Sequence, residues 1–192
     1  MRYASVDPCT GLEQQAFVAA SDAQVEAALQ AAVAAAARAR AEPPAARAPR
    51  LRALAALLER EAGPLARLAA GEMGKPLAQG EAEVRKCALG LRWAADEGPA
   101  LLAPEPRPAD GHEAVVRHEP LGPLLGLMPW NFPYWQVLRF AGPALLAGNT
   151  VLLKHAPSVP RCAQALEALL HEAGLGAGAY ANLFLSEAQA AA

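Results

Sequence analysis

The stretch LLGLMPWNFPYWQ, Leu124 to Gln136, places two tryptophans and two prolines around a single asparagine, Asn131. The apolar run LGPLLGLM that leads into it is short and flanked by proline and glycine, which is the pattern of a β-strand buried on both faces. The residues that follow, Tyr134 to Leu146, have the apolar spacing of a helix. A strand, a turn and a helix in this order are the beginning of a parallel sheet.

Two more units of the same kind follow this stretch. TVLLK, Thr150 to Lys154, predicts a second buried strand, Pro160 to Ala173 a helix, and Tyr180 to Leu185 a third strand. Because the connections are long enough for parallel pairing, residues 122 to 185 predict half of a doubly wound, nucleotide-binding α/β sheet. Such sheets usually have more than three strands, so we expect the sheet to be incomplete.

The first half of the chain predicts helices. The turn cluster Asp7 to Gly11 indicates a small strand pair, and Ser21 with Gln24 forms a capping-box signature for a helix that runs from about Asp22 to Arg40. Apolar spacing indicates further helices around Leu51 to Leu58, around Leu65 to Leu68 after a break at Gly63 and Pro64, and from Leu77 to about Glu97.

These patterns suggest three regions within one partial nucleotide-binding domain. Residues 1–103 contain the N-terminal strands and helices. Residues 104–120 are rich in proline and acidic residues and predict a hairpin or linker. Residues 121–192 contain the first strands and helices of the Rossmann-like sheet.

Composition excludes several classes of partner. The chain has 192 residues, 54% of them hydrophobic, and a net charge of −2, so we expect no binding to nucleic acid or to an anionic membrane. No leader segment and no apolar run of about 18 residues is present, which predicts a cytoplasmic protein without a membrane span. The three cysteines are far apart and predict buried or partly buried free thiols, and the four histidines lack the spacing of a metal site. We expect three glutamates to lie on solvated helix faces: Glu72, Glu81 and Glu83.

Ligands of parallel sheets bind beyond the carboxyl ends of the strands, where the sequence places Asn131 and Lys154. The Asn131 amide could donate a hydrogen bond to a developing oxyanion, or the side chain could cap the following helix. Lys154 could bind ribose hydroxyls or phosphate, or could be a solvated lysine at a strand end. The first turn is not G-x-G-x-x-G, so a dinucleotide would bind without the usual glycine-rich cradle.

Three motifs occur in the order found in aldehyde dehydrogenases: EMGKP at Glu72 to Pro76, MPWNFP at Met128 to Pro133, and GPALLAGNTVLLKHAPSVP at Gly142 to Pro160. The chain resembles the N-terminal helices and cofactor domain of that superfamily up to about Leu185. MPWNFPYWQVLR and LLKHAPSVP are most similar to the succinate-semialdehyde dehydrogenase branch. The resemblance implies NAD(P)-dependent oxidation of an aldehyde, such as succinate semialdehyde, to the carboxylic acid, and a homo-oligomer for the full-length protein. In that chemistry a cysteine thiolate attacks the aldehyde, hydride passes to the nicotinamide, and a glutamate-activated water releases the acyl group.

The resemblance also assigns roles to individual residues. Asn131 matches the side-chain donor of the oxyanion hole. Met128, Pro129 and Trp130 match the turn that lines the cofactor cleft, and Lys154 matches the lysine that binds the adenosine ribose.

Two further assignments concern specificity. Many NAD-preferring relatives have a glutamate where this chain has Pro157, followed by Ser158, so we expect mixed use of NAD and NADP or a preference for NADP. Asn131, Trp135 and Arg139 are spaced to share one helix face. The resemblance implies that Trp135 and Arg139 line the substrate tunnel and that Arg139 pairs with a distal carboxylate; the alternative is a plain surface arginine.

The family's nucleophilic cysteine stands in a G-x-x-C motif and its general-base glutamate in an E-L-G-G motif, and neither motif occurs in these residues. We therefore expect the chain to be truncated and inactive alone. We also expect its uncovered sheet edge to make it prone to aggregation. Two alternatives remain open. The chain could be an assembly or regulatory fragment that docks through Pro104 to Pro120, a region that in the family helps to form oligomers, or it could be a bare dinucleotide-binding module.

Overall fold

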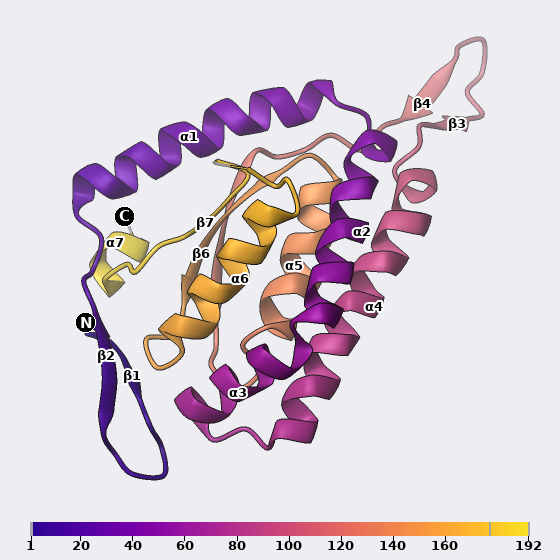
Figure 1. Ribbon diagram of the computed structural model, residues 1–192. Helices are drawn as coiled ribbons and strands as arrows, with labels where there is room; N and C mark the ends of the chain where they lie inside the picture. The colour runs from indigo at the N-terminus through magenta and orange to yellow at the C-terminus, as the bar shows by residue number, and fades with distance from the viewer. Residues whose placement is uncertain (1, 177, 192) are drawn as a thin grey trace.

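Three strands pair in parallel in the order β5-β6-β7 and form the central sheet (Figure 1). They are β5 (Pro123–Met128), β6 (Thr150–His155) and β7 (Tyr180–Asn182), and the computed structural model describes residues 2–176 and 178–191. Helices α5 (Trp135–Leu146) and α6 (Pro160–Glu172) connect the strands. The predicted α/β class and the parallel pairing are confirmed, although the third strand ends at Asn182 rather than at Leu185.

The two larger strands differ in how they are covered. Every residue of β6 is buried except Lys154, which is partly buried, so the prediction of a buried strand is confirmed there. In β5, Leu125 is 45% exposed and Leu127 is 60% exposed, so the prediction that this strand is buried on both faces is wrong. A Cβ at Gly126 would meet the Phe140 ring of α5, and side chains alternate along a strand, so Leu125 and Leu127 project from the opposite face.

Helices cover both faces of the sheet. Helix α1 crosses one face, mainly over β6, while α5 and α6 cover the other face (Figure 1). Three helices form a further layer that packs on α5 and α6, and one hydrophobic core runs through this layer to the sheet. The layer consists of α2 (Pro44–Arg60), α3 (Ala62–Met73) and α4 (Leu77–Leu101), and the helix on the other face of the sheet, α1, spans Asp22–Ala41.

The N-terminal helices largely follow the sequence prediction. Ser21 and Gln24 form the predicted capping box, with the Gln24 amide 3.3 Å from Ser21 Oγ and the Ser21 amide 2.9 Å from Gln24 Oε1. The break after α2 falls at Glu61, and Gly63 and Pro64 lie in the first turn of α3, where proline is tolerated.

Two antiparallel hairpins and one short helix complete the described chain. β1 (Tyr3–Val6) pairs with β2 (Glu13–Phe17), as predicted. β3 (Glu105–Arg107) pairs with β4 (Ala114–Val116) in a hairpin that projects from the body of the molecule (Figure 1). Helix α7 (Glu187–Ala191) follows β7. Within the described residues, no helix has the length and apolar character needed to cross a bilayer.

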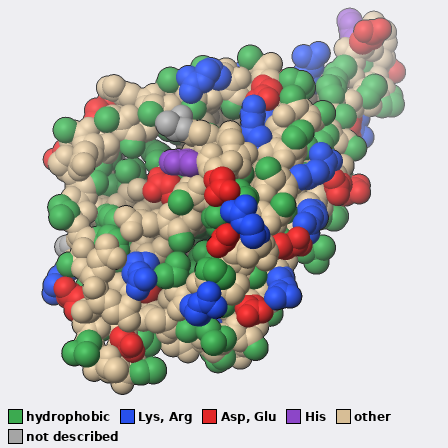
Figure 2. Space-filling model, viewed as in Figure 1, with side chains coloured by type: hydrophobic (Ala, Val, Ile, Leu, Met, Phe, Trp, Pro, Cys, Tyr) green, Lys and Arg blue, Asp and Glu red, His purple; other side chains and the backbone are tan. Residues whose placement is uncertain are grey.

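The surface carries charges of both signs. Figure 2 shows basic and acidic side chains interspersed on the viewed face, with no extended patch of one sign. Several are paired, as in Arg50 with Glu42 and Arg60 with Glu172. The mixture agrees with the small net charge of the sequence.

Candidate active site

The turn after β5 brings Asn131 to the carboxyl end of the sheet. Met128 pairs with His155 and Leu127 with Lys154, so the ends of β5 and β6 lie side by side at one edge. Asn131 lies in the turn that follows and is exposed. Its side-chain amide makes no hydrogen bond to any residue that the structure describes, so this donor remains available to a ligand.

Asn131 does not belong to helix α5. The helix begins at Trp135 with Tyr134 as its N-cap residue, and no cap hydrogen bond comes from the Tyr134 side chain. The predicted helix face shared by Asn131, Trp135 and Arg139 is therefore wrong for Asn131, because the two prolines of the sequence enclose an irregular turn. Capping by Asn131 is excluded as well, since the capping oxygen is Oε1 of Glu83, which accepts the Tyr134 and Trp135 amides, each at 2.9 Å.

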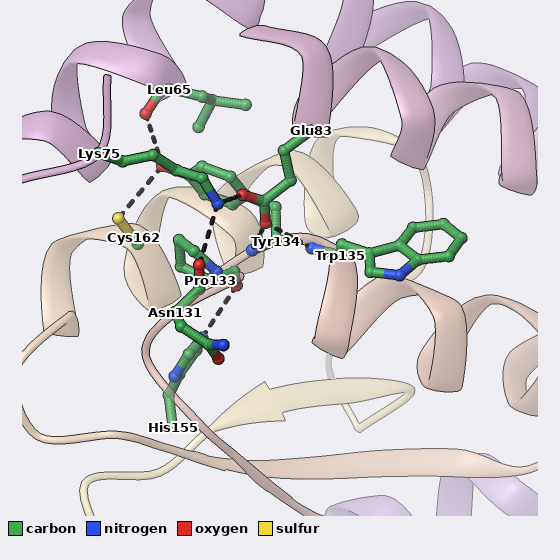
Figure 3. Close-up of polar contacts among 9 residues, drawn as sticks. All are labelled: Leu65, Lys75, Glu83, Asn131, Pro133, Tyr134, Trp135, His155 and Cys162. Carbon is green, nitrogen blue, oxygen red and sulfur yellow. Dashed lines mark hydrogen bonds and ion pairs between the residues drawn. The ribbon is translucent and has the colours of Figure 1, made fainter. Parts of the chain in front are cut away.

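A buried ion pair lies under the turn. Lys75 and Glu83 form an ion pair in which both side chains are buried. Lys75 Nζ also donates to the Asn131 carbonyl at 3.0 Å and lies 4.0 Å from the centroid of the Phe132 ring. Figure 3 shows this carbonyl facing Lys75, while the Asn131 amide extends away from the ion pair.

The expectation that Glu72 and Glu83 lie on solvated helix faces is wrong. Each is only 4% exposed, and each accepts two backbone amides at the start of a crossover helix. Glu72 accepts the amides of Arg161 at 3.0 Å and Cys162 at 2.9 Å. Glu81 does lie in an exposed ion pair with Arg85. The available sequence signal for Glu72 and Lys75 was their position in the EMGKP motif.

His155 is hydrogen-bonded to the turn that carries Asn131. Its Nδ1 accepts the Ala156 amide at 2.8 Å, so the proton of the neutral ring is on Nε2, which donates to the Pro133 carbonyl at 2.9 Å. Burial lowers the pKa of His155 below its ordinary value of 6.5. The ring is therefore neutral near pH 7 and acts as a hydrogen-bond donor.

The buried cysteines are poor nucleophiles. Burial raises the pKa of both the Cys87 and the Cys162 thiol, so neither is a thiolate at neutral pH. Cys162 Sγ lies 3.2 Å from the Tyr134 hydroxyl, which donates to the Leu65 carbonyl at 2.8 Å. Cys9 is exposed in the N-terminal hairpin. The three cysteines are free thiols, as predicted, but the expectation that they are buried or partly buried is wrong for Cys9.

A cavity of about 470 Å³ opens beside the ends of β5 and β6. Three of the predicted cofactor-binding residues, Met128, Pro129 and Lys154, line it together with Leu127. The opposite wall comes from α7 and consists of Glu187, Ala190 and Ala191.

The other three predicted cofactor-binding residues lie outside the lining of this cavity. Trp130 is 52% exposed and Ser158 is exposed. The Pro157 carbonyl accepts the Ala4 amide at 3.3 Å and so ties the loop after β6 to β1.

A second cavity, of about 190 Å³, lies between α4 and α5 and is lined by both predicted substrate-binding residues, Trp135 and Arg139. Arg139 is exposed and forms no ion pair with a described residue. Lys86 Nζ lies 4.2 Å from the centroid of the Trp135 ring. The rest of the lining is largely apolar: Cys87, Gly90, Leu91, Trp93, Ala94, Leu138 and Pro143.

The described residues therefore combine an available amide donor with two cavities of different character, one beside the strand ends and one between α4 and α5. No group of three or more His, Cys, Asp or Glu side chains arranged to hold a metal ion occurs among them. An amide donor fixed on a rigid turn suits the stabilisation of a negative oxygen.

Comparison with known proteins matches residues 1–191 to the model of the aldehyde dehydrogenase family. The chain belongs to the aldehyde dehydrogenase family. It is 44% identical over 189 residues to succinate-semialdehyde dehydrogenase [NADP(+)] 1 of Mycobacterium tuberculosis, a match that covers 97% of this chain. It is 43% identical over 183 residues to succinate-semialdehyde dehydrogenase [NADP(+)] of Deinococcus radiodurans, with 95% of this chain covered.

Solved structures of the same family share the fold. The succinic semialdehyde dehydrogenase of Streptococcus pyogenes, in complex with NADP+, superposes with a TM-score of 0.95 at 32% identity over 98% of this chain. The match covers 42% of that structure, 41% of the mycobacterial relative and 38% of the Deinococcus relative. The chain thus spans about two-fifths of the length of these family members.

Proposed function

We propose that this chain supplies the oxyanion donor and part of the cofactor and substrate sites for NAD(P)-dependent oxidation of an aldehyde to a carboxylic acid. The observation that carries the proposal is the exposed Asn131 amide, which has no partner among the described residues and lies on a turn held by buried side chains. As a nucleophile attacks an aldehyde, the carbonyl oxygen becomes negative, and a donor such as Asn131 stabilises that charge by about 3 kcal/mol.

The substrate in this proposal is an aldehyde with a distal carboxylate, such as succinate semialdehyde. Arg139 has no carboxylate partner among the described residues, and the Lys86 ammonium contacts the ring of Trp135 in the same lining. A guanidinium binds a carboxylate through paired hydrogen bonds, and the apolar lining suits the methylene groups between the two ends of the substrate.

The cofactor in this proposal is NAD or NADP, bound in the cavity beside β5 and β6. Lys154 would donate to the adenosine ribose, and Met128 and Pro129 would line the cleft. Pro157 offers no carboxylate to repel a 2′-phosphate, and the two relatives named above both carry NADP(+) in their names. We therefore expect NADP to be accepted.

The nucleophilic cysteine and the general base would come from outside these 192 residues, because neither family motif occurs in them. In the working enzyme we expect a cytoplasmic homo-oligomer, with the β3–β4 hairpin at a subunit contact. Val115 and Val116 of this hairpin are exposed and would be covered in that contact.

A hybrid enzyme tests the proposal. Residues 1–191 are joined to the part of the Mycobacterium tuberculosis relative that follows the matched region, and oxidation of succinate semialdehyde is followed with NADP+ and with NAD+. We expect turnover that Asn131→Ala lowers by about two to three orders of magnitude. A soluble hybrid that retains full turnover with Asn131→Ala would refute the role of the amide.

Calorimetry on the chain alone separates the remaining candidates. Saturable binding of NADP+ or NAD+ without an active hybrid would favour a bare dinucleotide-binding module. Absence of binding, together with stable association with a full-length relative, would favour an assembly fragment.

A further inference from the structure

We infer that Lys75 and Glu83 are positioning residues, which hold the turn Pro129 to Tyr134 and thereby fix the direction in which Asn131 presents its amide. The inference rests on the proposed oxyanion role of Asn131. Neither side chain lines the cavities described above, so both would act through the turn and not on the substrate.

The contacts bracket Asn131 along the backbone. Lys75 binds the Asn131 carbonyl at 3.0 Å, and Glu83 binds the Tyr134 and Trp135 amides at 2.9 Å each. Between these points, the ring of Pro133 restricts the backbone and its carbonyl accepts a hydrogen bond from His155. Figure 3 shows all of these contacts converging on the turn while the Asn131 amide remains outside them.

The ion pair couples the two anchoring points. Lys75 and Glu83 bond to each other as well as to the turn, and both are buried. Removing one partner leaves the other as a buried charge without compensation. The surrounding structure must then relax so that water can reach this charge. Substitution of either Lys75 or Glu83 is therefore expected to loosen both ends of the turn.

Glu72 provides a matched control within the same fold. It is as buried as Glu83, and it likewise accepts two backbone amides at the start of a crossover helix. Its partners are Arg161 and Cys162 of α6, and it makes no hydrogen bond to the turn that carries Asn131. A general loss of stability would be shared by Glu72 and Glu83 variants, whereas loosening of the turn would not.

The test measures the turn directly in the full 192-residue chain. NMR relaxation reports the order parameters of the Asn131 and Phe132 backbone amides, and hydrogen exchange reports the protection of other amides. In Lys75→Met we expect the order parameters to fall from about 0.85 to below about 0.6. Lys75→Arg keeps a cation with several donors and is expected to restore most of the order.

Hydrogen exchange gives a crossed comparison. Glu83→Gln should speed exchange of the Tyr134 and Trp135 amides about tenfold and leave Arg161 and Cys162 unchanged. Glu72→Gln should do the reverse. If Lys75→Met does not yield a folded chain, the isosteric Glu83→Gln carries the comparison through the order parameters of Asn131.

Two results would overturn the inference. One is an Asn131 backbone that stays rigid in the folded Lys75→Met or Glu83→Gln chain. The other is equal loosening of the turn by Glu72→Gln. Neither measurement requires turnover, so this inference can fail while the proposed function holds, and the reverse is also true.

Discussion

At the scale of single residues, the site depends on buried polar side chains that reach across from other elements. Neither α5 nor α6 receives a hydrogen bond from its own N-cap side chain. Instead, Glu83 caps α5 and Glu72 caps α6, so each carboxylate also complements the positive end of a helix dipole. The starting points of both crossover helices are thereby fixed by residues from the N-terminal helices.

Arg139 is expected to set substrate preference in the hybrid enzyme. Arg139→Leu should lower kcat/KM for succinate semialdehyde by about 10- to 100-fold, because one charge-assisted interaction is lost, while kcat/KM for butanal changes little. The measurement is the ratio of the two values. Arg38→Leu removes an exposed arginine from α1 and serves as the charge-matched control. An unchanged ratio in Arg139→Leu would show that Arg139 is a plain surface residue.

His155 is expected to make stability depend on pH. Its pKa in the folded chain is lowered by burial, so below about pH 6.5 the unfolded chain binds protons that the folded chain does not. Stability should therefore fall as the pH decreases from about 7.5 to about 5.5, as measured by urea unfolding. His155→Gln keeps a donor for the Pro133 carbonyl but does not titrate, and should flatten this dependence. His112→Gln changes an exposed histidine and should leave it intact.

At the scale of elements, most helices and strands were predictable because their apolar periods, caps and breakers are local signals. The capping box of Ser21 and the alternation of strand and helix after Gly122 belong to this class. Which face of an element packs was less predictable. In α1, Leu29 and Val33 are 40% and 58% exposed, whereas Ala32 and Ala35 are buried. Small side chains allow the helix to approach the sheet closely, and apolar spacing alone does not reveal this.

Close packing of α1 leads to a prediction for Gly178, which precedes β7. Its φ is +89°, and a Cβ there would lie 2.4 Å from the Ala31 carbonyl oxygen, a backbone atom that cannot rotate away. Gly178→Ala should therefore lower the free energy of unfolding by about 2–4 kcal/mol, from strain and overpacking together. Gly176→Ala is the control, because a Cβ at Gly176 meets nothing within 4 Å. Urea unfolding of both variants measures the difference, and equal midpoints would contradict the packing of α1 against this turn.

At the scale of the whole molecule, one hydrophobic core joins the N-terminal helices to the sheet. The sequence predicted which residues lie at the carboxyl ends of the strands, because parallel topology brings those ends together. It did not predict that Glu72, Lys75 and Glu83 reach the site, since their burial depends on tertiary contacts between α3, α4 and the crossover helices. It also did not predict the exposed side of β5, because burial of a strand depends on what covers the sheet and not on its own composition.

That exposed side is expected to make the isolated chain self-associate. Among the described residues, no strand pairs with the outer edge of β5, and Leu125 and Leu127 are exposed beside it. An open edge next to apolar side chains favours pairing between chains, and a lysine at such an edge opposes it. Leu125→Lys should therefore lower the weight-average mass in sedimentation experiments at a given chain concentration.

Leu12→Lys is the control. It adds the same charge at a leucine that is 68% exposed, against 45% for Leu125, but lies in the turn of the N-terminal hairpin. If exposure or net charge alone drove association, Leu12→Lys would act at least as strongly; a larger effect of Leu125→Lys would locate association at the sheet edge.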